Sequence, residues 1–294
     1  MCRGSLDLVT SLATPPPTEI AADLLDDLRT ARRGAVALPA LEPATYARDH
    51  AAFELLSDQR GLIAGHLAGR LAGMGDGPLS ILSVGCGDGS LDARLAAGLV
   101  AAAPGRPVRY VGVEPWEGSA ALFVERMSSL DAPEVSAEVH VAAFADVSLD
   151  EMFDVVVFVH SMYYVADVGT ALRAALALLR PGGELWVLNA PKAALNALVD
   201  VLAPPQENHR QWFSADVGEA FADVGIILEE AVTLDALVDL LATTDEVLDF
   251  AVQARLTPEL RDPVRAYLRA VAVPARDGSS RVPHPVDVFR AIRH

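Results

Sequence analysis

The chain has 294 residues, of which 52% are hydrophobic, and its formal net charge is −17. This length and composition allow one large α/β domain with additions, or two small domains. A surface this acidic repels phosphate backbones and anionic lipids, so we expect neither nucleic acid nor a membrane among its partners. The N-terminus lacks a secretory pattern, and the two cysteines are too few for a disulfide framework. We therefore expect a cytoplasmic protein with a small-molecule partner.

The expected elements change character along the chain. Residues 20–33 and 44–74 have helical periodicity, with two helices in the second stretch. From residue 77 onward strands and helices alternate, which predicts βαβ units and a mostly parallel sheet. We predict strands at 81–84, 108–113, 139–141, 154–159, 184–188, 226–228 and 285–292. The helices between them are predicted at 91–102, 117–129, 170–179 and 214–224, with further helices throughout 232–280.

A glycine-rich turn follows the first predicted strand. It contains Gly85, Cys86, Gly87, Asp88 and Gly89 and leads directly into a helix. Glycines can adopt positive φ and let the backbone pass close to a ligand, and ligands of open α/β sheets bind beyond the carboxyl ends of the strands. Taken alone, the turn is weak evidence, because a tight connection that binds no ligand can have the same pattern. Cys86 lies between two glycines, which favours a packing role over a nucleophile.

An acidic residue follows the second strand. Glu114 lies where a carboxylate can accept hydrogen bonds from both hydroxyls of a ribose, which predicts a nucleoside cofactor. The spacing of the glycines is Gly-x-Gly-x-Gly, whereas nicotinamide enzymes typically have Gly-x-Gly-x-x-Gly. The pattern therefore favours a nucleoside other than a nicotinamide dinucleotide.

Four segments in this order resemble class I S-adenosylmethionine-dependent methyltransferases. They are Val84–Gly89, Val113–Pro115, Phe153–His160 and Leu179–Leu185. The resemblance implies an α/β fold with a Rossmann-like seven-stranded methyltransferase sheet and helical substrate-cap segments, and S-adenosyl-L-methionine as cofactor. It implies that the cofactor is bound by Gly85, Cys86, Gly87, Asp88, Gly89, Glu114, Pro115, Ser119 and Val159. One departure is Ser83, where the family often has an acidic residue.

The resemblance also divides the chain into three parts. Residues 1–76 are expected to form an N-terminal helical segment that contributes to the substrate cap. Residues 77–231 would form the Rossmann-like core that binds the cofactor. Residues 232–294 would form a helical insert and then the final strand of the core sheet.

A closer resemblance concerns the substrate site. Tyr163-Tyr164-Val165 and residues 211–216 resemble histamine N-methyltransferases and related bacterial indole C3-methyltransferases of secondary metabolism. That resemblance implies substrate-binding roles for Gln59, His160, Tyr164 and Trp212, and His284 is a further candidate because it lies near the last predicted strand. Each of them could instead be a packing or surface residue. Gln59 replaces a glutamate of the histamine enzymes, which argues against histamine. Aromatic residues at the site suit a larger, flatter ring.

The leading hypothesis is therefore C3-methylation of an indole. In this hypothesis His160 accepts the ring proton as a catalytic base, or forms a hydrogen bond with it, while Tyr163 or Tyr164 fixes the ring. N-methylation of an imidazole or an amine is the first alternative, and a cofactor-binding protein without catalysis is the second. Methyl transfer needs no metal, and we find no metal-ligand spacing in the sequence, so we expect no metal.

Overall fold

The computed structural model describes residues 19–34, 38–39, 41, 43–204 and 211–294. At its centre is a seven-stranded sheet with the order β3-β2-β1-β4-β5-β10-β6. The predicted fold class is confirmed. The strands are β1 (Leu79–Val84), β2 (Val108–Val113), β3 (Val135–His140), β4 (Phe153–Val159), β5 (Leu179–Asn189), β6 (Leu228–Leu234) and β10 (Val286–Ile292).

The pairing of the strands explains their composition. β1 to β5 run parallel, and β10 lies antiparallel to both β5 and β6. All residues of β1 are buried, and in β4 only the second and last residues are not. Strands of a parallel sheet are covered on both faces, so they are near-continuous apolar runs rather than alternating ones.

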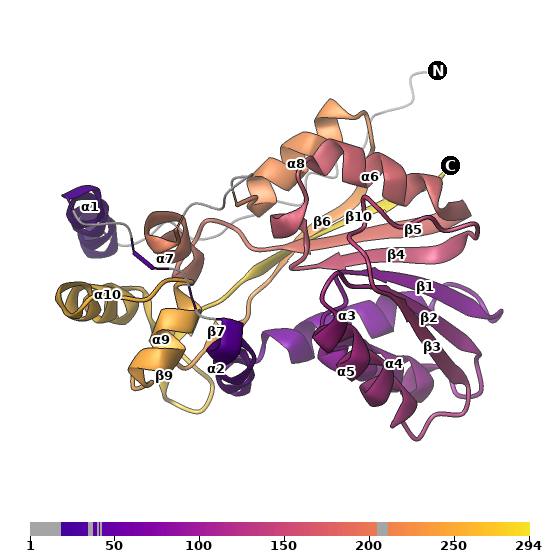
Figure 1. The fold of residues 1–294 in the computed structure, drawn as a ribbon, viewed down its shortest axis with the longest axis horizontal. Helices are drawn as coiled ribbons and strands as arrows, with labels where there is room; N and C mark the ends of the chain where they lie inside the picture. The colour runs from indigo at the N-terminus through magenta and orange to yellow at the C-terminus, as the bar shows by residue number, and fades with distance from the viewer. Residues whose placement is uncertain (1–18, 35–37, 40, 42, 205–210) are drawn as a thin grey trace, which may run out of the picture.

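Helices cover both faces of this sheet (Figure 1). One face carries α3 (Gln59–Ala72), α4 (Ser90–Ala102) and α5 (Glu117–Ser128), and the other carries α6 (Val168–Ala177) and α8 (Ser214–Asp223). A short 3-10 helix, η1 (Met162–Tyr164), follows β4. A Cβ atom on Gly98 would lie 2.9 Å from the Cβ of Ala68, so the absence of a side chain lets α4 approach α3 closely.

A second group of elements forms what we call the lobe, at one end of the sheet (Figure 1). It comprises α1 (Glu19–Gly34), α2 (Pro43–Leu56), α7 (Leu195–Leu202), α9 (Asp245–Ala251), α10 (Pro258–Val271) and a small sheet of β7 (Leu237–Val238), β9 (Ser280–Pro283) and β8 (Val273–Pro274). The lobe has its own hydrophobic core, in which Leu28, Leu198 and Tyr267 are almost fully buried. Full burial of a leucine side chain contributes about 1.5–3 kcal/mol to the stability of the fold.

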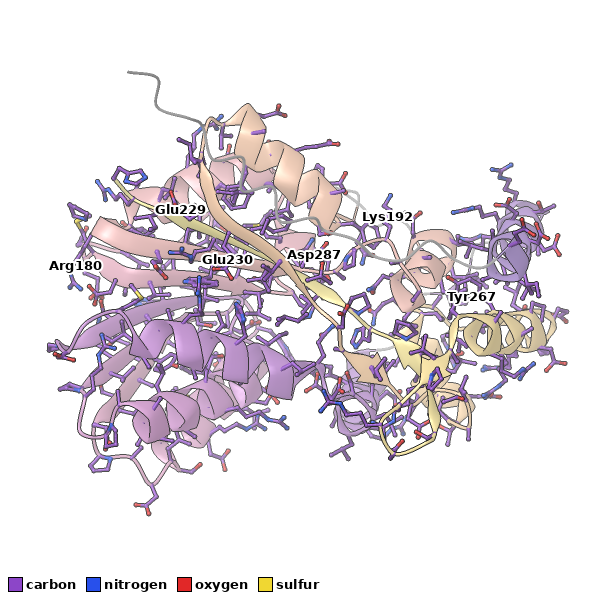
Figure 2. All side chains as sticks on the ribbon, turned by 180° about the vertical axis from the view of Figure 1, so that it is seen from behind. Arg180, Lys192, Glu229, Glu230, Tyr267 and Asp287 are labelled. Atoms are coloured by element: carbon purple, nitrogen blue, oxygen red, sulfur yellow. The ribbon has the colours of Figure 1, made fainter. Side chains whose placement is uncertain are left out.

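The direction of β5 shows which end of the sheet the lobe covers. Arg180, near the start of β5, lies at the end of the sheet far from the lobe, and Lys192, just beyond its end, lies beside the lobe (Figure 2). Tyr267 lies within the lobe, where its hydroxyl donates to the carbonyl of Ala194 at 3.0 Å. The lobe therefore lies beyond the carboxyl ends of the parallel strands, where ligands of open α/β sheets bind.

Several expected elements differ from the structure. Residues 232–280 are not helical throughout, because this stretch also contributes β7, β8 and a strand residue of β9 to the small sheet. The sixth strand is β6, Leu228–Leu234, rather than 226–228, so it crosses the expected boundary between 231 and 232. The third strand begins earlier than predicted, and α7 was not predicted. In addition, α3 packs on the sheet with α4, in a core separate from that of the lobe.

Candidate active site

The glycine turn connects β1 to α4 with three left-handed residues. Gly85, Gly87 and Gly89 have φ angles of 69°, 56° and 73°. A Cβ atom on Gly85 would lie 2.4 Å from the Cβ of Ser161, and one on Gly89 would lie 2.8 Å from the ring of Phe123. Gly87 differs from both, because nothing lies within 4 Å of the position of a Cβ atom there. Neighbouring side chains therefore occupy the space beside Gly85 and Gly89, whereas the backbone of Gly87 faces open space.

Glu114, directly after β2, faces this bare segment. Its Oε2 accepts a hydrogen bond from the backbone N–H of Gly87 at 3.0 Å, and its Oε1 accepts one from the N–H of Trp116 at 3.0 Å. These two bonds fix the carboxylate at the carboxyl end of β2. Each carboxylate oxygen has a further lone pair with which to accept from a ligand hydroxyl. A bare glycine beside an oriented acceptor fits the ribose of a nucleoside cofactor.

The other expected cofactor residues surround these two. Pro115 is exposed, and Ser119 is partly buried on the first turn of α5. Val159 is the partly buried last residue of β4 and pairs with β5. Asp88 accepts from the N–H of Ser90 at 3.0 Å and forms an ion pair with Arg126, which indicates a role in holding the turn.

Cys86 is buried within the turn. Burial raises the pKa of its thiol, and the negative charges of Asp92 and Glu114 raise it further. Because the thiolate is the reactive form of cysteine, this thiol is inert near neutral pH. The structure gives Cys86 a packing position, in agreement with its placement between glycines.

A second group of side chains meets at the carboxyl end of β4. Nε2 of His160 lies 2.7 Å from Oε1 of Gln59, and its Nδ1 lies 3.0 Å from the hydroxyl of Tyr163. Nε2 of Gln59 donates to the carbonyl of His284 at 2.7 Å. His160 has a φ of 52°, a left-handed conformation that is uncommon for residues other than glycine. The structure thus brings together residues from α3, the end of β4, η1 and the segment between β9 and β10.

This group is uncharged near neutral pH. Burial, together with the nearby His284, Arg60 and His50, lowers the pKa of His160 to about 3. Burial likewise lowers the pKa of His284 to about 4. Burial raises the pKa of the Tyr163 hydroxyl. A ligand at the end of β4 therefore meets hydrogen-bonding groups without charge.

Two expected substrate residues lie apart from this group. Tyr164 is 61% exposed, with its ring perpendicular to that of Tyr163 at a centroid distance of 6.4 Å. Trp212 is partly buried against the core beneath the sheet, and its indole N–H donates to the carbonyl of Val165 at 2.9 Å. The geometry thus accounts for Trp212 as a packing residue, and its predicted contact with substrate stays a prediction.

The structure adds residues that the sequence analysis did not identify. The side chain of Arg60 contacts Glu54 and Ser90, and its guanidinium lies 3.2 Å from His50, which links α2 to the start of α4. Ser161 is buried, and its hydroxyl has no hydrogen-bond partner among the described residues. Arg60 could have been identified from the sequence, because it follows Gln59 at the start of a helix. No pattern in the sequence around Ser161 indicates that it belongs to the site.

Comparison with protein families places this site in context. Residues 52–226 match the model of a family described as a methyltransferase domain. The chain belongs to this family. The protein is an S-adenosylmethionine-dependent methyltransferase, so the hypothesis of a cofactor-binding protein without catalysis is not supported. The match spans α3, the glycine turn, Glu114 and the end of β4, which are the elements that form the site.

Solved structures with TM-scores above 0.5 agree with this fold, and a third structure is similar at a lower score. A candidate methyltransferase of Bacillus halodurans is 16% identical, with a TM-score of 0.52 over 77% of this chain and 96% of its own. The YcgJ protein of Bacillus subtilis is 13% identical, with a TM-score of 0.51 over 78% and 98%. Geranyl diphosphate C-methyltransferase of Streptomyces coelicolor is 15% identical, with a TM-score of 0.49 over 95% and 100%. No curated protein matches the sequence.

Two further properties concern only the described part of the chain. No helix there is both long and apolar enough to cross a membrane. Within the same ranges, no three His, Cys, Asp or Glu side chains are grouped so that they could hold a metal ion. That the enzyme works without a metal stays a prediction.

Proposed function

We propose that the enzyme methylates a small heteroaromatic metabolite derived from an amine. The observation that carries this proposal is the uncharged group of Gln59, His160 and Tyr163 beside the glycine turn. The turn and the group are adjacent because Gly85 packs directly on Ser161, the residue after His160. A ring that lies against these side chains is close to a cofactor held by the turn.

The cofactor would be held by the residues that surround the turn. We assign this role to Gly85, Cys86, Gly87, Asp88, Gly89, Glu114, Pro115, Ser119 and Val159. S-adenosylmethionine supplies an electrophilic methyl group when bound. In this assignment Glu114 accepts hydrogen bonds from the ribose hydroxyls, and the bare backbone at Gly87 lets the nucleoside lie close. Alignment of two reactants by such contacts can contribute about 7–11 kcal/mol to lowering a barrier.

The substrate would lie between this turn and the lobe. Gln59, His160, Tyr164 and His284 are the proposed contacts, with Trp212 in a supporting position. The exposed ring of Tyr164 stands perpendicular to that of Tyr163, which offers both an aromatic face and an aromatic edge to a flat ligand. The lobe, through its five helices and its small sheet, would limit the access of water to the site.

Either a carbon or a nitrogen atom of the substrate is a candidate for methylation. The aromatic surfaces of Tyr163 and Tyr164 favour carbon 3 of an indole, the larger and flatter ring. The hydrogen bonds of His160 favour a nitrogen of an imidazole or an amine, because both ring nitrogens of His160 are engaged and neither is free to take the indole proton. A base role for His160 requires that its bond with Tyr163 first be broken.

A substrate panel tests the proposal. The purified enzyme is incubated with S-adenosylmethionine carrying a labelled methyl group and with indoles, imidazoles and aliphatic amines. We expect label in a heteroaromatic product whose mass increases by one methyl group, and NMR of the product identifies the methylated atom. Transfer to aliphatic amines alone, or to no small molecule while the cofactor binds, would contradict the proposal.

A further inference from the structure

The hydrogen bonds around His160 have a direction that one backbone group determines. The N–H of Ala190, at the end of β5, donates to the hydroxyl oxygen of Tyr163 at 3.0 Å. A backbone N–H can only donate, so the Tyr163 oxygen is an acceptor in this bond. The single proton of the Tyr163 hydroxyl is then available for its other partner, Nδ1 of His160 at 3.0 Å.

This direction selects one tautomer of His160. Nδ1 accepts from Tyr163 and therefore carries no proton. In a neutral imidazole the proton then lies on Nε2, which faces Oε1 of Gln59 at 2.7 Å. An amide oxygen accepts, so this second bond is satisfied by the same tautomer. No other assignment gives each of these groups a complementary partner.

Gln59 is held in the matching orientation from the other side. Its amide nitrogen donates to the carbonyl of His284 at 2.7 Å, which directs its oxygen toward His160. Its backbone N–H donates to the hydroxyl of Ser57 at 3.2 Å, and that hydroxyl lies 3.1 Å from Nδ1 of His284. The amide of this 4% exposed side chain is thus fixed without reference to His160.

We propose that Tyr163 and Gln59 are positioning residues that hold His160 as a neutral imidazole with its proton on Nε2. His160 then meets the substrate as a hydrogen-bond donor, and the site selects a substrate that presents an acceptor lone pair at this point. A lone pair can replace the Gln59 oxygen as the partner of Nε2–H, whereas a substrate N–H cannot. This inference rests on the proposed function for the place of the substrate, but the state of His160 does not depend on it.

The charges around His160 support this state. The titratable groups that face it are His284 from the segment between β9 and β10, Arg60 from α3 and His50 from α2, and all three disfavour a positive charge on its ring. Glu54 on α2, an acid that acts on the neighbouring His284, is itself paired with Arg60 and lies 3.4 Å from His50. No carboxylate is among the described hydrogen-bond partners of His160.

Nitrogen-15 NMR of the histidine rings in the full chain tests the tautomer directly. The signals of His160 are assigned by their loss in His160→Gln. We expect the neutral Nε2–H pattern in the unmodified protein, unchanged between about pH 8 and pH 5, where an ordinary histidine titrates. Tyr163→Phe removes the donor to Nδ1, so the pattern becomes a mixture of tautomers. The matched control Tyr267→Phe removes a buried tyrosine hydroxyl in the lobe and leaves the His160 pattern unchanged.

A second variant covers the case in which Tyr163→Phe fails to fold. Gln59→Glu places a carboxylate against Nε2, so His160 acquires a measurable pKa that is raised by about one unit or more. Titration of wild-type His160 near pH 6.5, an Nδ1–H pattern, or a pattern insensitive to both variants overturns the inference.

Two small probes test the preference for an acceptor, each added to the protein with S-adenosylhomocysteine. Imidazole offers a lone pair and pyrrole offers only an N–H. We expect imidazole to shift the His160 Nε2 signal and pyrrole to leave it in place. A shift with pyrrole equal to that with imidazole overturns the donor role, while the proposed methylation of a heteroaromatic ring would still stand. Failure of the substrate panel, in turn, leaves the tautomer result intact.

Discussion

Gly85 and Ser161 lie so close together that a Cβ atom on Gly85 would be 2.4 Å from the Cβ of Ser161. The first residue follows β1 and the second follows β4, and these two strands are neighbours in the sheet. They meet where the strand order reverses, because β2 and β3 lie to one side of β1 and β5 lies beyond β4. This contact places the proposed cofactor turn beside His160 and Tyr163.

Replacement of Glu114 by alanine is expected to weaken binding of S-adenosylhomocysteine more than tenfold. Hydrogen bonds from ribose hydroxyls to a charged acceptor contribute about 1.5–3 kcal/mol, and the variant removes that acceptor. Calorimetric titration measures the affinity. Glu117→Ala, which changes an exposed acid on the neighbouring helix, is the control and is expected to bind normally. Equal affinity in both variants would refute the role assigned to Glu114.

Gly87→Ala is expected to reduce cofactor affinity and stability together. Its φ of 56° strains any L side chain by about 1–2 kcal/mol, and the added methyl group would occupy the open space toward the ligand. Gly278→Ala is the matched control, because Gly278 has a φ of 83°, open surroundings and a place in the lobe. Denaturant unfolding should show similar losses of stability in both, and calorimetry should show lost affinity only in Gly87→Ala. Unimpaired binding by Gly87→Ala would contradict a close approach of the cofactor.

Stability is expected to fall as the pH drops below about 6.5 through two buried histidines. Their pKa values in the folded state are lowered to about 3 for His160 and about 4 for His284. Below about pH 6.5 these histidines are therefore protonated in the unfolded chain while they stay neutral in the folded chain. Each group then contributes a slope of up to about 1.4 kcal/mol per pH unit. Asp92 has the opposite effect between pH 6 and 3.8, because burial raises its pKa to about 6 in the folded state.

Comparison of variants separates these effects. Urea unfolding at pH 7 and pH 5 should show a smaller loss of stability in His160→Gln than in the wild type, since Asp92 is common to both. His284→Gln should behave in the same way. An identical loss in the wild type and both variants would mean that neither histidine is protected from protonation.

Tyr164→Ala is expected to change the KM, whereas Trp212→Phe is expected to change the stability. Tyr164 is exposed and its side chain makes no described hydrogen bond, so its truncation should raise the KM for the substrate found in the panel and leave the free energy of unfolding unchanged. Trp212→Phe removes the indole N–H that bonds Val165, which should cost about 0.5–1.5 kcal/mol of stability with little change in KM. A large rise in KM for Trp212→Phe would restore the substrate contact predicted from the sequence.

The sequence was sufficient for features that depend on local patterns. The glycines of the turn adopt positive φ because of the local path of the backbone, and Glu114 follows β2 directly. The spacing of these residues along the sequence was therefore enough to predict the turn and the position of Glu114. The alternation of apolar strands and helices likewise predicts a parallel sheet. The short strands outside the main sheet could not be predicted in this way. Short strands such as β8 lie beside a strongly helical stretch, and their pairing depends on partners distant in the sequence.

What the sequence by itself determined is the sheet, the glycine turn and the family to which they belong, because each depends on neighbours along the chain. Only the tertiary structure determined the state of His160. Its ring is held between Tyr163, three residues away, and Gln59, which is 101 residues away. The direction of both bonds depends on the backbone N–H of Ala190, a group that every residue except proline possesses. A histidine in the sequence can be a base, a donor or a packing residue, and the partners that folding brings to its two nitrogens select among them.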